Sequence, residues 1–319
     1  MRTCAAAAVF VLAFWQLSQS ATKQSVTPPV AVVPFRDTGH IYIKGGISGF
    51  RDLSMVIDTG APESVLSQTI YLQLKLPFTG MVNFPGGFGG GVMNPMPTTS
   101  VPFIRFGSSA IKNLPFIVLP PDFIPKMPGA EVDAIIGSEL FNHYVVELDY
   151  PNKVVRLYDP VNYREPQSGC KLPLRLGPKP SPLPLVHAKI VTKAGRSVDA
   201  VLFLDTGGQV AVMLTNVFTM QHPELLKDVP THSEEADGIG ASTRFRIGRV
   251  PAIQLGACTI HDPMVAFSQD KRGMGQGGDF FSGEIGLSVF RRFTTIFDYP
   301  AGFVVFQSNA ASSEGGNHK

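Results

Sequence analysis

Two apolar segments of the chain end in the same three residues, Asp-Thr-Gly. Met55–Ile57 runs into Asp58-Thr59-Gly60, and Val201–Leu204 runs into Asp205-Thr206-Gly207. Burying a carboxylate behind an apolar strand costs free energy unless the charge is paired or neutralised. A chain that does this twice must supply a partner for each carboxylate, and this requirement constrains its fold more than any other feature.

A third copy of the triplet lies upstream, at Asp37-Thr38-Gly39. It follows Phe35-Arg36 and has no apolar strand before it. Asp and Gly are common turn formers, so we interpret this copy as an ordinary turn. The triplet alone is therefore a weak signal, and the apolar strand before it carries the argument.

Other landmarks recur in the same order behind the two strand-Asp-Thr-Gly segments. Ile135-Ile136-Gly137 has a counterpart in Glu284-Ile285-Gly286, and Leu148–Pro151 has one in Phe297–Pro300. The spacing is nearly constant: Asp58 and Asp205 are 147 positions apart, and Gly137 with Gly286 and Asp149 with Asp298 are each 149 positions apart. This pattern predicts an internal duplication of a lobe of roughly 130 residues.

The composition favours a β-rich globular protein. The 319 residues are 44% hydrophobic and 16% charged, with 32 Gly and 27 Pro, which suits strands joined by many turns. We predict an all-β fold with a few short helices, the clearest helix candidate being Asn216–Lys227. A net charge of +2 without runs of Lys and Arg argues against a nucleic-acid partner.

Residues 1–20 have the pattern of a secretory signal peptide. Arg2 precedes the apolar run Ala5–Trp15, and Ser18 and Ser20 stand before a cleavage position at Ala21. A buried N-terminal strand or an uncleaved anchor is the alternative, although the run is short for crossing a bilayer. We therefore expect a secreted or periplasmic protein whose mature form has no membrane contact.

The rest of the chain divides at a segment rich in Pro, Gly and charge. We predict an N-terminal lobe over residues 21–160, a linker over 161–184, a C-terminal lobe over 185–309 and a polar tail over 310–319. Cys4 would leave with the signal peptide. Cys170 and Cys258 then form an even pair in an oxidising compartment, and the sequence leaves open whether they are bridged.

Two equivalent aspartates near a pseudo-twofold axis would meet each other. Carboxylates about 3 Å apart cannot both ionise, so the pair holds one proton between them. One charged and one protonated carboxyl can activate water and polarise a carbonyl group. Asp58 and Asp205 are therefore the candidate catalytic residues. Thr59, Gly60, Thr206 and Gly207 are the supporting candidates, through hydroxyl bonds across the axis and close backbone approach.

The glycine-rich stretch Phe84–Val92 is a candidate flap over this site. A phosphate loop would need a helix start after it, and Met93–Pro97 cannot open a regular helix. The candidate substrate-binding residues of the flap are Gly87, Phe88, Gly89 and Gly90. A second glycine tip at residues 238–240 is either another flap or a plain hairpin turn.

The combined pattern resembles the aspartic protease superfamily. Val56–Ala61 is similar to the retropepsin form of its catalytic motif. Ile135-Ile136-Gly137 resembles its hydrophobic-hydrophobic-Gly element, and Glu284-Ile285-Gly286 does so imperfectly. The resemblance covers about residues 30–307. It implies two closed β-barrels related by a pseudo-twofold axis and hydrolysis of a peptide or protein substrate by water held between Asp58 and Asp205. It implies no metal and no cofactor, and we expect a monomer because one chain supplies both aspartates.

The chain departs from the pepsin-like pattern at three points. Pepsin-like enzymes carry Ser or Thr after the triplet, and here Ala61 and Gly208 stand there. Residues 80–105 contain no Tyr, so a flap tyrosine is missing, and the pepsin disulfides have no counterpart. These departures indicate two fused retropepsin-type lobes, as in bacterial secreted retropepsin-like proteins. Loss of both outer hydroxyl bonds predicts activity at mildly acidic to neutral pH.

The competing interpretation is a catalytically silent peptide-binding protein with the same fold. A binding protein would gain little from a costly pair of buried carboxylates. Serine and metallo-hydrolase motifs are missing from the sequence, since it has neither G-x-S-x-G nor H-E-x-x-H. Retention of both aspartates therefore favours an aspartic endopeptidase.

Overall fold

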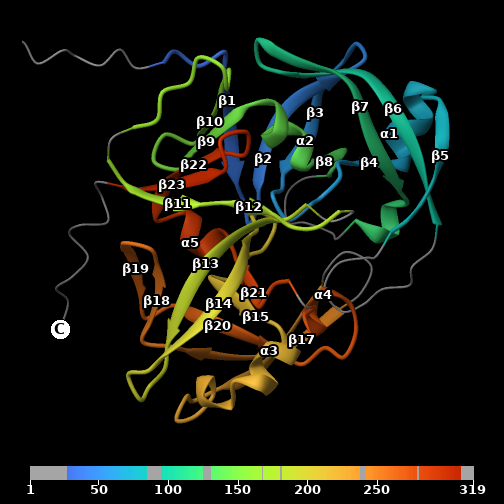
Figure 1. Cartoon of the computed structure of the whole chain (residues 1–319). Helices are drawn as coiled ribbons and strands as arrows, with labels where there is room; N and C mark the ends of the chain where they lie inside the picture. The colour runs from blue at the N-terminus through green and yellow to red at the C-terminus, as the bar shows by residue number, and fades with distance from the viewer. Residues whose placement is uncertain are drawn as a thin grey trace, which may run out of the picture.

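The computed structural model describes residues 27–84, 95–124, 131–166, 168–179, 182–237, 242–278 and 280–309. The predicted signal peptide at residues 1–20 and the predicted polar tail at 310–319 lie outside these ranges. Within them, short strands and a few short helices form two lobes, one above the other in Figure 1. No helix among the described residues is long and apolar enough to cross a bilayer.

The described residues of the first half of the chain form ten strands. They are β1 (Ala31–Asp37), β2 (Ile41–Ile47), β3 (Phe50–Ile57), β4 (Val65–Ser67), β5 (Phe78–Asn83), β6 (Pro95–Phe106), β7 (Ser109–Leu119), β8 (Ala134–Ile136), β9 (Val145–Asp149) and β10 (Val154–Tyr158). Its helices are α1 (Gln68–Leu74), the 3-10 turn η1 (Pro121–Phe123) and α2 (Ser138–His143).

The second half repeats this succession. Its strands are β11 (Cys170–Pro173), β12 (Arg175–Leu176), β13 (Pro184–Val191), β14 (Ser197–Leu204), β15 (Val212–Leu214), β16 (His232–Asp237), β17 (Ser242–Arg249), β18 (Ala252–Leu255), β19 (Cys258–His261), β20 (Met264–Ser268), β21 (Gly283–Ile285), β22 (Phe293–Asp298) and β23 (Phe303–Ser308). Its helices are α3 (Asn216–Gln221), η2 (Pro223–Leu225), α4 (Gly273–Gln276) and α5 (Leu287–Phe290).

The two halves use the same strand pairings. β3 runs parallel to β8, which pairs antiparallel with β4, and β4 runs parallel to β7. In the second half β14, β21, β15 and β20 repeat these three relations in the same order. The prediction of a mainly β fold with two related barrels is confirmed.

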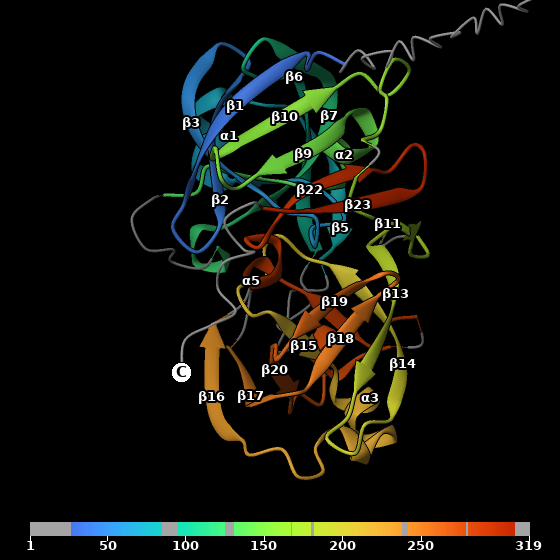
Figure 2. The same ribbon diagram turned by 90° about the vertical axis from the view of Figure 1, so that its left-hand side faces the viewer.

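A sheet shared by both halves joins the lobes. β22 and β23 lie beside β9 and β10, giving the strand order β11-β23-β22-β9-β10-β1 at one end of the 13-stranded sheet (Figure 2). Where the two lobes meet in this sheet, Glu147 of β9 is paired with Ile296 of β22. These two residues are 149 positions apart, the same offset as the sequence landmarks, so the pseudo-twofold axis passes between them.

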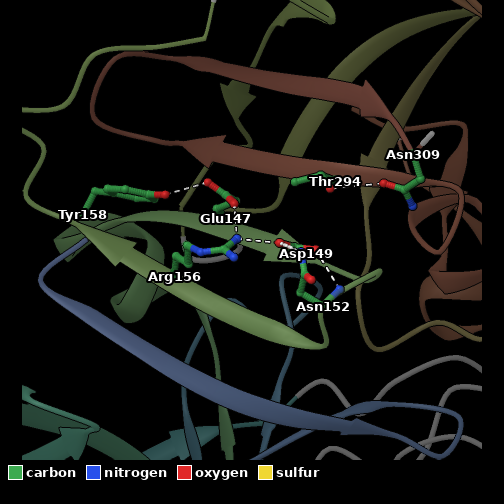
Figure 3. A network of polar contacts seen from close by, with 7 residues as sticks. All are labelled: Glu147, Asp149, Asn152, Arg156, Tyr158, Thr294 and Asn309. Carbon is green, nitrogen blue, oxygen red and sulfur yellow. Dashed lines mark hydrogen bonds and ion pairs between the residues drawn. The ribbon is translucent and has the colours of Figure 1, made fainter. Parts of the chain in front are cut away.

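Polar side chains cover one face of the shared sheet on the β9–β10 side (Figure 3). The guanidinium of Arg156 bonds to Glu147 and Asp149, at 2.6 Å each. The Tyr158 hydroxyl donates to Glu147 at 2.7 Å, and Asn152 donates its side-chain amide to Asp149 at 2.7 Å. These bonds connect two acidic side chains of β9 with Arg156 and Tyr158 of the adjacent β10 and stabilise the register of the hairpin.

Aromatic side chains pack between the lobes behind this sheet. Phe141 of α2 contacts Phe297 of β22 edge-on, with ring centroids 5.4 Å apart, and stacks on Tyr299 at 5.3 Å. Both phenylalanines are fully buried. Because large buried rings contribute most to the free energy of packing, this contact makes α2 and β22 one unit across the lobe boundary.

The hairpin before Asp58 and the helix α3 were both predicted from the sequence. The hairpin predicted to deliver Asp58 is present as β2 and β3, with Tyr42 opposite Val56. The helix predicted over Asn216–Lys227 is shorter: α3 ends at Gln221, and η2 begins at Pro223. Proline has no N–H for the helical ladder and its ring clashes with the preceding turn, which explains the early end.

The segment 161–184 contains strands that connect the lobes. β11 pairs with β23, and β12 pairs with β13. Cys170 of β11 is bridged to Cys258 of β19, which answers the question that the sequence left open. The bridge ties the shared sheet to the edge of the 10-stranded sheet of the C-terminal lobe.

Removing this bridge should destabilise the chain without changing its fold. The disulfide closes a loop over a sequence separation of 88 residues. A loop of this length predicts a loss of about 4 kcal/mol in the free energy of unfolding for Cys170→Ser with Cys258→Ser. Denaturant unfolding of the double variant and the oxidised parent measures the difference, and equal midpoints would contradict it.

Candidate active site

Each catalytic candidate follows a central strand directly. Asp58 leaves β3, and its N–H bonds to the Ile136 carbonyl of β8 at 3.0 Å. Asp205 leaves β14, and its N–H bonds to the Ile285 carbonyl of β21 at 2.8 Å. Parallel pairing with β8 and β21 buries both feeding strands on two faces, which accounts for their unbroken apolar sequences.

The two threonines after the aspartates exchange hydrogen bonds between the lobes. The Thr59 hydroxyl donates to the Leu204 carbonyl at 2.7 Å and accepts the Thr206 N–H at 2.9 Å. The Thr206 hydroxyl donates to the Ile57 carbonyl at 3.0 Å and accepts the Thr59 N–H at 3.0 Å. Both threonines are buried. These four bonds hold the two Asp-Thr-Gly turns against each other.

The glycine of each triplet bonds to the carboxyl of its own triplet and leaves space for the carboxyl of the other. The Gly60 N–H donates to Asp58 at 2.8 Å, and the Gly207 N–H donates to Asp205 at 2.7 Å. A Cβ atom at Gly60 would collide with the carboxyl of Asp205, and one at Gly207 would collide with that of Asp58. Only glycine leaves room for the two carboxyls to approach each other.

Asp58 and Asp205 are joined by a side-chain hydrogen bond. Burial raises the pKa of Asp58 well above its ordinary value, and the negative charge of Asp205 and this hydrogen bond raise it further. Asp205 is only 7% exposed, whereas Asp58 keeps a partly exposed surface. These effects favour the protonated form of Asp58, and its surface can still be reached from solvent.

A third carboxyl, which the sequence analysis did not select, lies beside this pair. Glu284 of β21 is 3% exposed and is hydrogen-bonded to Asp205. Burial raises the pKa of Glu284 well above its ordinary value, followed by the charge of Asp205, the hydrogen bond to it and the charge of Asp58. The available signal was a charged residue in an otherwise apolar Glu284-Ile285-Gly286 element.

His40 is a second residue that the sequence analysis missed. It is 7% exposed, makes a hydrogen bond with the backbone of Gly207, and its Nδ1 has no hydrogen-bond partner. Burial lowers the pKa of His40, although the charge of Asp205 acts in the opposite direction. The imidazole therefore stays neutral at the edge of the site. No sequence pattern marks it, since it is a single histidine in a turn.

The upstream triplet forms a turn between β1 and β2, as interpreted from the sequence. Asp37 accepts two bonds from Arg291, at 2.6 and 2.7 Å. The Arg291 guanidinium holds the pKa of Asp37 below its usual value. This aspartate therefore stabilises the contact between the lobes through an ion pair.

The predicted flap residues Gly87, Phe88, Gly89 and Gly90 lie outside the described residues, as does the second tip at 238–240. The flanking strands are described. β5 and β6 pair up to Asn83 opposite Pro95, and β16 and β17 pair up to Asp237 opposite Ser242.

An apolar wall lies next to Asp58 and under the β5–β6 hairpin. We define this wall as the buried cluster of Tyr42, Val56, Val65, Met96, Ile117, Leu119 and Ile135, against which Ala61, Val82 and Phe84 pack. It connects the turn after Asp58 with the strands that lead to the predicted flap. No three His, Cys, Asp or Glu side chains in the described part of the chain are arranged as metal ligands.

The chain is similar to known aspartyl proteases in part of its sequence and in its fold. Residues 43–140 match the family model for aspartyl proteases. The chain is similar in fold to an aspartic proteinase from Irpex lacteus, with a TM-score of 0.54 and 12% identity over 90% of this chain and 99% of that one. The chain also overlaps in part with a retropepsin-like aspartic protease from Rickettsia conorii. The overlap includes 40% of this chain and 89% of that one, with a TM-score of 0.29 and 17% identity. No curated protein matches in sequence.

Residues 43–140 match the aspartyl protease family, and the chain as a whole has the fold of the aspartic proteinase that it resembles. The match includes Asp58 and the Ile135-Ile136-Gly137 element and stops before the second half of the chain. The resemblance of the C-terminal lobe therefore rests on its fold.

Replacing Thr59 by valine should destabilise the chain strongly. The substitution keeps the side-chain volume but leaves the Thr206 N–H and the Leu204 carbonyl without their partner. Two buried groups left unpaired predict a loss of about 2–4 kcal/mol in the free energy of unfolding. Thr259→Val, at an exposed position of β19, is the matched control and should change little. Equal losses in both variants would contradict the predicted contribution of these hydrogen bonds to the free energy of unfolding.

Replacing Asp58 by asparagine should flatten the dependence of stability on pH. Because the Asp58 pKa is raised above its ordinary value of 3.8, the folded chain keeps a proton that the unfolded chain releases. This contribution is complete below pH 3.8 and is lost as the pH rises toward the native pKa, at up to about 1.4 kcal/mol per pH unit. The side-chain amide of the Asp58→Asn variant does not titrate, so the loss disappears.

Denaturant unfolding at a series of pH values measures this effect. Asp199→Asn on β14 is the control, since the Asp199 side chain is 87% exposed. Wild type and this control should lose stability in parallel as the pH rises, and Asp58→Asn should lose less. Three parallel curves would show that Asp58 takes up no proton on folding.

Proposed function

We propose that this protein is an aspartic endopeptidase that hydrolyses peptide bonds with water activated between Asp58 and Asp205. The observation that carries the proposal is the reciprocal bonding of Thr59 and Thr206, which brings the two carboxyls into hydrogen-bond contact. A shared proton between paired carboxyls is the state that acid–base hydrolysis needs. A binding protein would have no use for it.

The raised pKa of Asp58 supports distinct roles for the two carboxyls. Asp205, which carries the negative charge, takes a proton from water while the water oxygen attacks the peptide carbonyl carbon. Asp58 gives its proton to the carbonyl oxygen, and a tetrahedral diol forms. Asp205 then gives the proton that it took from water to the amide nitrogen, and one diol hydroxyl gives its proton back to Asp58. The C–N bond breaks, an amine and a carboxylic acid leave, and the carboxyl pair returns to its starting state. The N–H groups of Gly60 and Gly207 hold the carboxyl orientations throughout.

The substrate we propose is an extended peptide or a protein segment. The partly exposed side chains that pack against the apolar wall, Ala61, Val82 and Phe84, are the proposed contacts for an apolar substrate side chain next to Asp58. Residues 87–90 are proposed to cover the peptide from the other side.

We also propose that the chain acts as an exported monomer. Both carboxyls of the pair come from one chain, so a second copy adds nothing to the pair. The disulfide between Cys170 and Cys258 suits an oxidising compartment, in keeping with the proposed signal peptide at residues 1–20. The mature lobes would then span residues 21–160 and 185–309.

Cleavage of a diverse peptide mixture by the mature chain tests the proposal. We expect wild-type cleavage that a statine-type transition-state mimic inhibits. Asp58→Asn and Asp205→Asn should each lower kcat by about 10²–10⁴ while the chain stays folded, because each removes one half of the acid–base pair. Asp199→Asn serves as the control for loss of a carboxyl elsewhere on β14.

The pH profile provides a second readout of the same experiment. Ala61 and Gly208 supply no hydroxyl to the carboxyls, and the pKa of Asp58 is raised, so we expect maximal activity at mildly acidic to neutral pH. A pH optimum of about 2 would contradict this expectation. Full activity in either Asp→Asn variant would rule out the pair. No wild-type cleavage between about pH 3 and pH 8, with the mimic still bound, would favour the silent peptide-binding protein.

A further inference from the structure

Glu284 occupies a central and enclosed position in the C-terminal lobe. It lies on β21, opposite Phe203 of β14 on one side and Met213 of β15 on the other. The next residue, Ile285, belongs to the main apolar core, so the alternation along the strand directs Glu284 to the opposite face, where Asp205 lies.

The space for the Glu284 carboxyl comes from the missing side chain of residue 208. A Cβ atom at Gly208 would lie 2.6 Å from Oε1 of Glu284 and 3.2 Å from Oδ2 of Asp205. These two oxygens therefore border the same small volume. The other oxygen of Asp205, Oδ1, already accepts the Gly207 N–H. Glu284 therefore lies next to Oδ2 of Asp205, the oxygen that does not accept the Gly207 N–H.

The N-terminal lobe has an apolar residue at the corresponding position. Ile135 of β8 stands at the position that corresponds to Glu284, 149 residues earlier, and it packs with Ala61 in the apolar wall. Asp58 therefore has an apolar neighbour where Asp205 has a carboxyl. The pseudo-symmetry of the fold is broken at this pair of positions.

Among the described residues, no cation stands near enough to hold Glu284 in its charged form. The charged groups that act on it are Asp205 and Asp58, both acidic. His40 lies near Asp205 and is neutral, and Arg291 is paired with Asp37. β14 and β15 present Phe203 and Met213 opposite it. A carboxyl among acids in an enclosed site holds its proton and becomes a hydrogen-bond donor.

We propose that Glu284 is a positioning residue of the Asp58–Asp205 pair: its protonated carboxyl donates a hydrogen bond to Oδ2 of Asp205 and keeps Asp205 as the ionised member. A carboxylate that accepts an additional bond is stabilised in its charged form. The shared proton is then directed to Asp58, which has the apolar Ile135 at the position that corresponds to Glu284. This inference rests on the proposed function for its catalytic consequence, but the protonation of Glu284 can be tested without it.

Two substitutions separate donation from charge. Glu284→Gln retains an N–H donor of similar shape that cannot ionise, and Glu284→Ile copies Ile135 and removes the donor. We expect Glu284→Gln to keep kcat and the acidic limb of the pH profile close to wild type. Glu284→Ile should lower kcat by about tenfold or more, the factor expected for one bond to a charged group, with little change in KM. Its acidic limb should move up by about one pH unit.

Glu139→Gln is the matched control. Glu139 is another largely enclosed carboxyl, its pKa is raised by burial, and its bonds go to Ser64 instead of the aspartates. Its loss should leave the pH profile in place. A wild-type profile in Glu284→Ile would overturn the inference. Equal impairment of Glu284→Gln and Glu284→Ile would also overturn it, because the ionised form would then be the one required.

Infrared spectroscopy of the folded chain gives a readout that needs neither cleavage nor the isoleucine variant. At about pH 6, above the ordinary pKa of glutamate, wild type should show a C=O stretch from protonated carboxyl groups. Glu284→Gln should lose one such component, and Asp58→Asn should lose a different one. An unchanged spectrum in Glu284→Gln would overturn the inference. Loss of the component in a chain that cleaves no peptide would refute the proposed function alone.

Discussion

The exchange of hydrogen bonds between Thr59 and Thr206 is the interaction on which the site depends. Each hydroxyl donates to a carbonyl in the opposite lobe and accepts an N–H from the opposite turn. Without these bonds the lobes would still meet through the shared sheet, but nothing would hold two acidic turns in contact. Because both threonines are buried, each bond that is broken leaves a polar group without water, and the arrangement has a single low-energy geometry.

The shared sheet and the interlobe aromatic contacts make this exchange possible. Pairing of β9 with β22 and the contact of Phe141 with Phe297 fix the lobes before any polar group in the site is considered. The threonines therefore act within an interface that is already formed by apolar burial and strand pairing. The ion pair of Asp37 with Arg291 and the disulfide add connections at its edges.

The site gathers acidic groups where the folded chain supplies little positive charge. The pKa values of Asp58 and Glu284 are both raised, so folding takes up protons instead of being stabilised by ion pairs. Such an arrangement costs stability as the pH rises and gives a carboxyl pair with a proton to transfer. The glycines at 60, 207 and 208 are part of the same requirement, since side chains there would occupy the space of the carboxyls.

The sequence by itself determined the elements that depend on local order along the chain. Apolar strands before Asp58 and Asp205, the constant offset and the turn chemistry of Asp37-Thr38-Gly39 were sufficient to predict the two-lobed β fold. Only the tertiary structure showed that Cys170 reaches Cys258 and that His40 and Glu284 lie beside Asp205. Those neighbours come from segments far apart in the chain, and contacts between distant segments leave no periodic pattern. Glu284 was visible in the sequence as a charged residue in an otherwise apolar triplet. Its place beside Asp205 could be recognised only from the position of Gly208 in the folded chain.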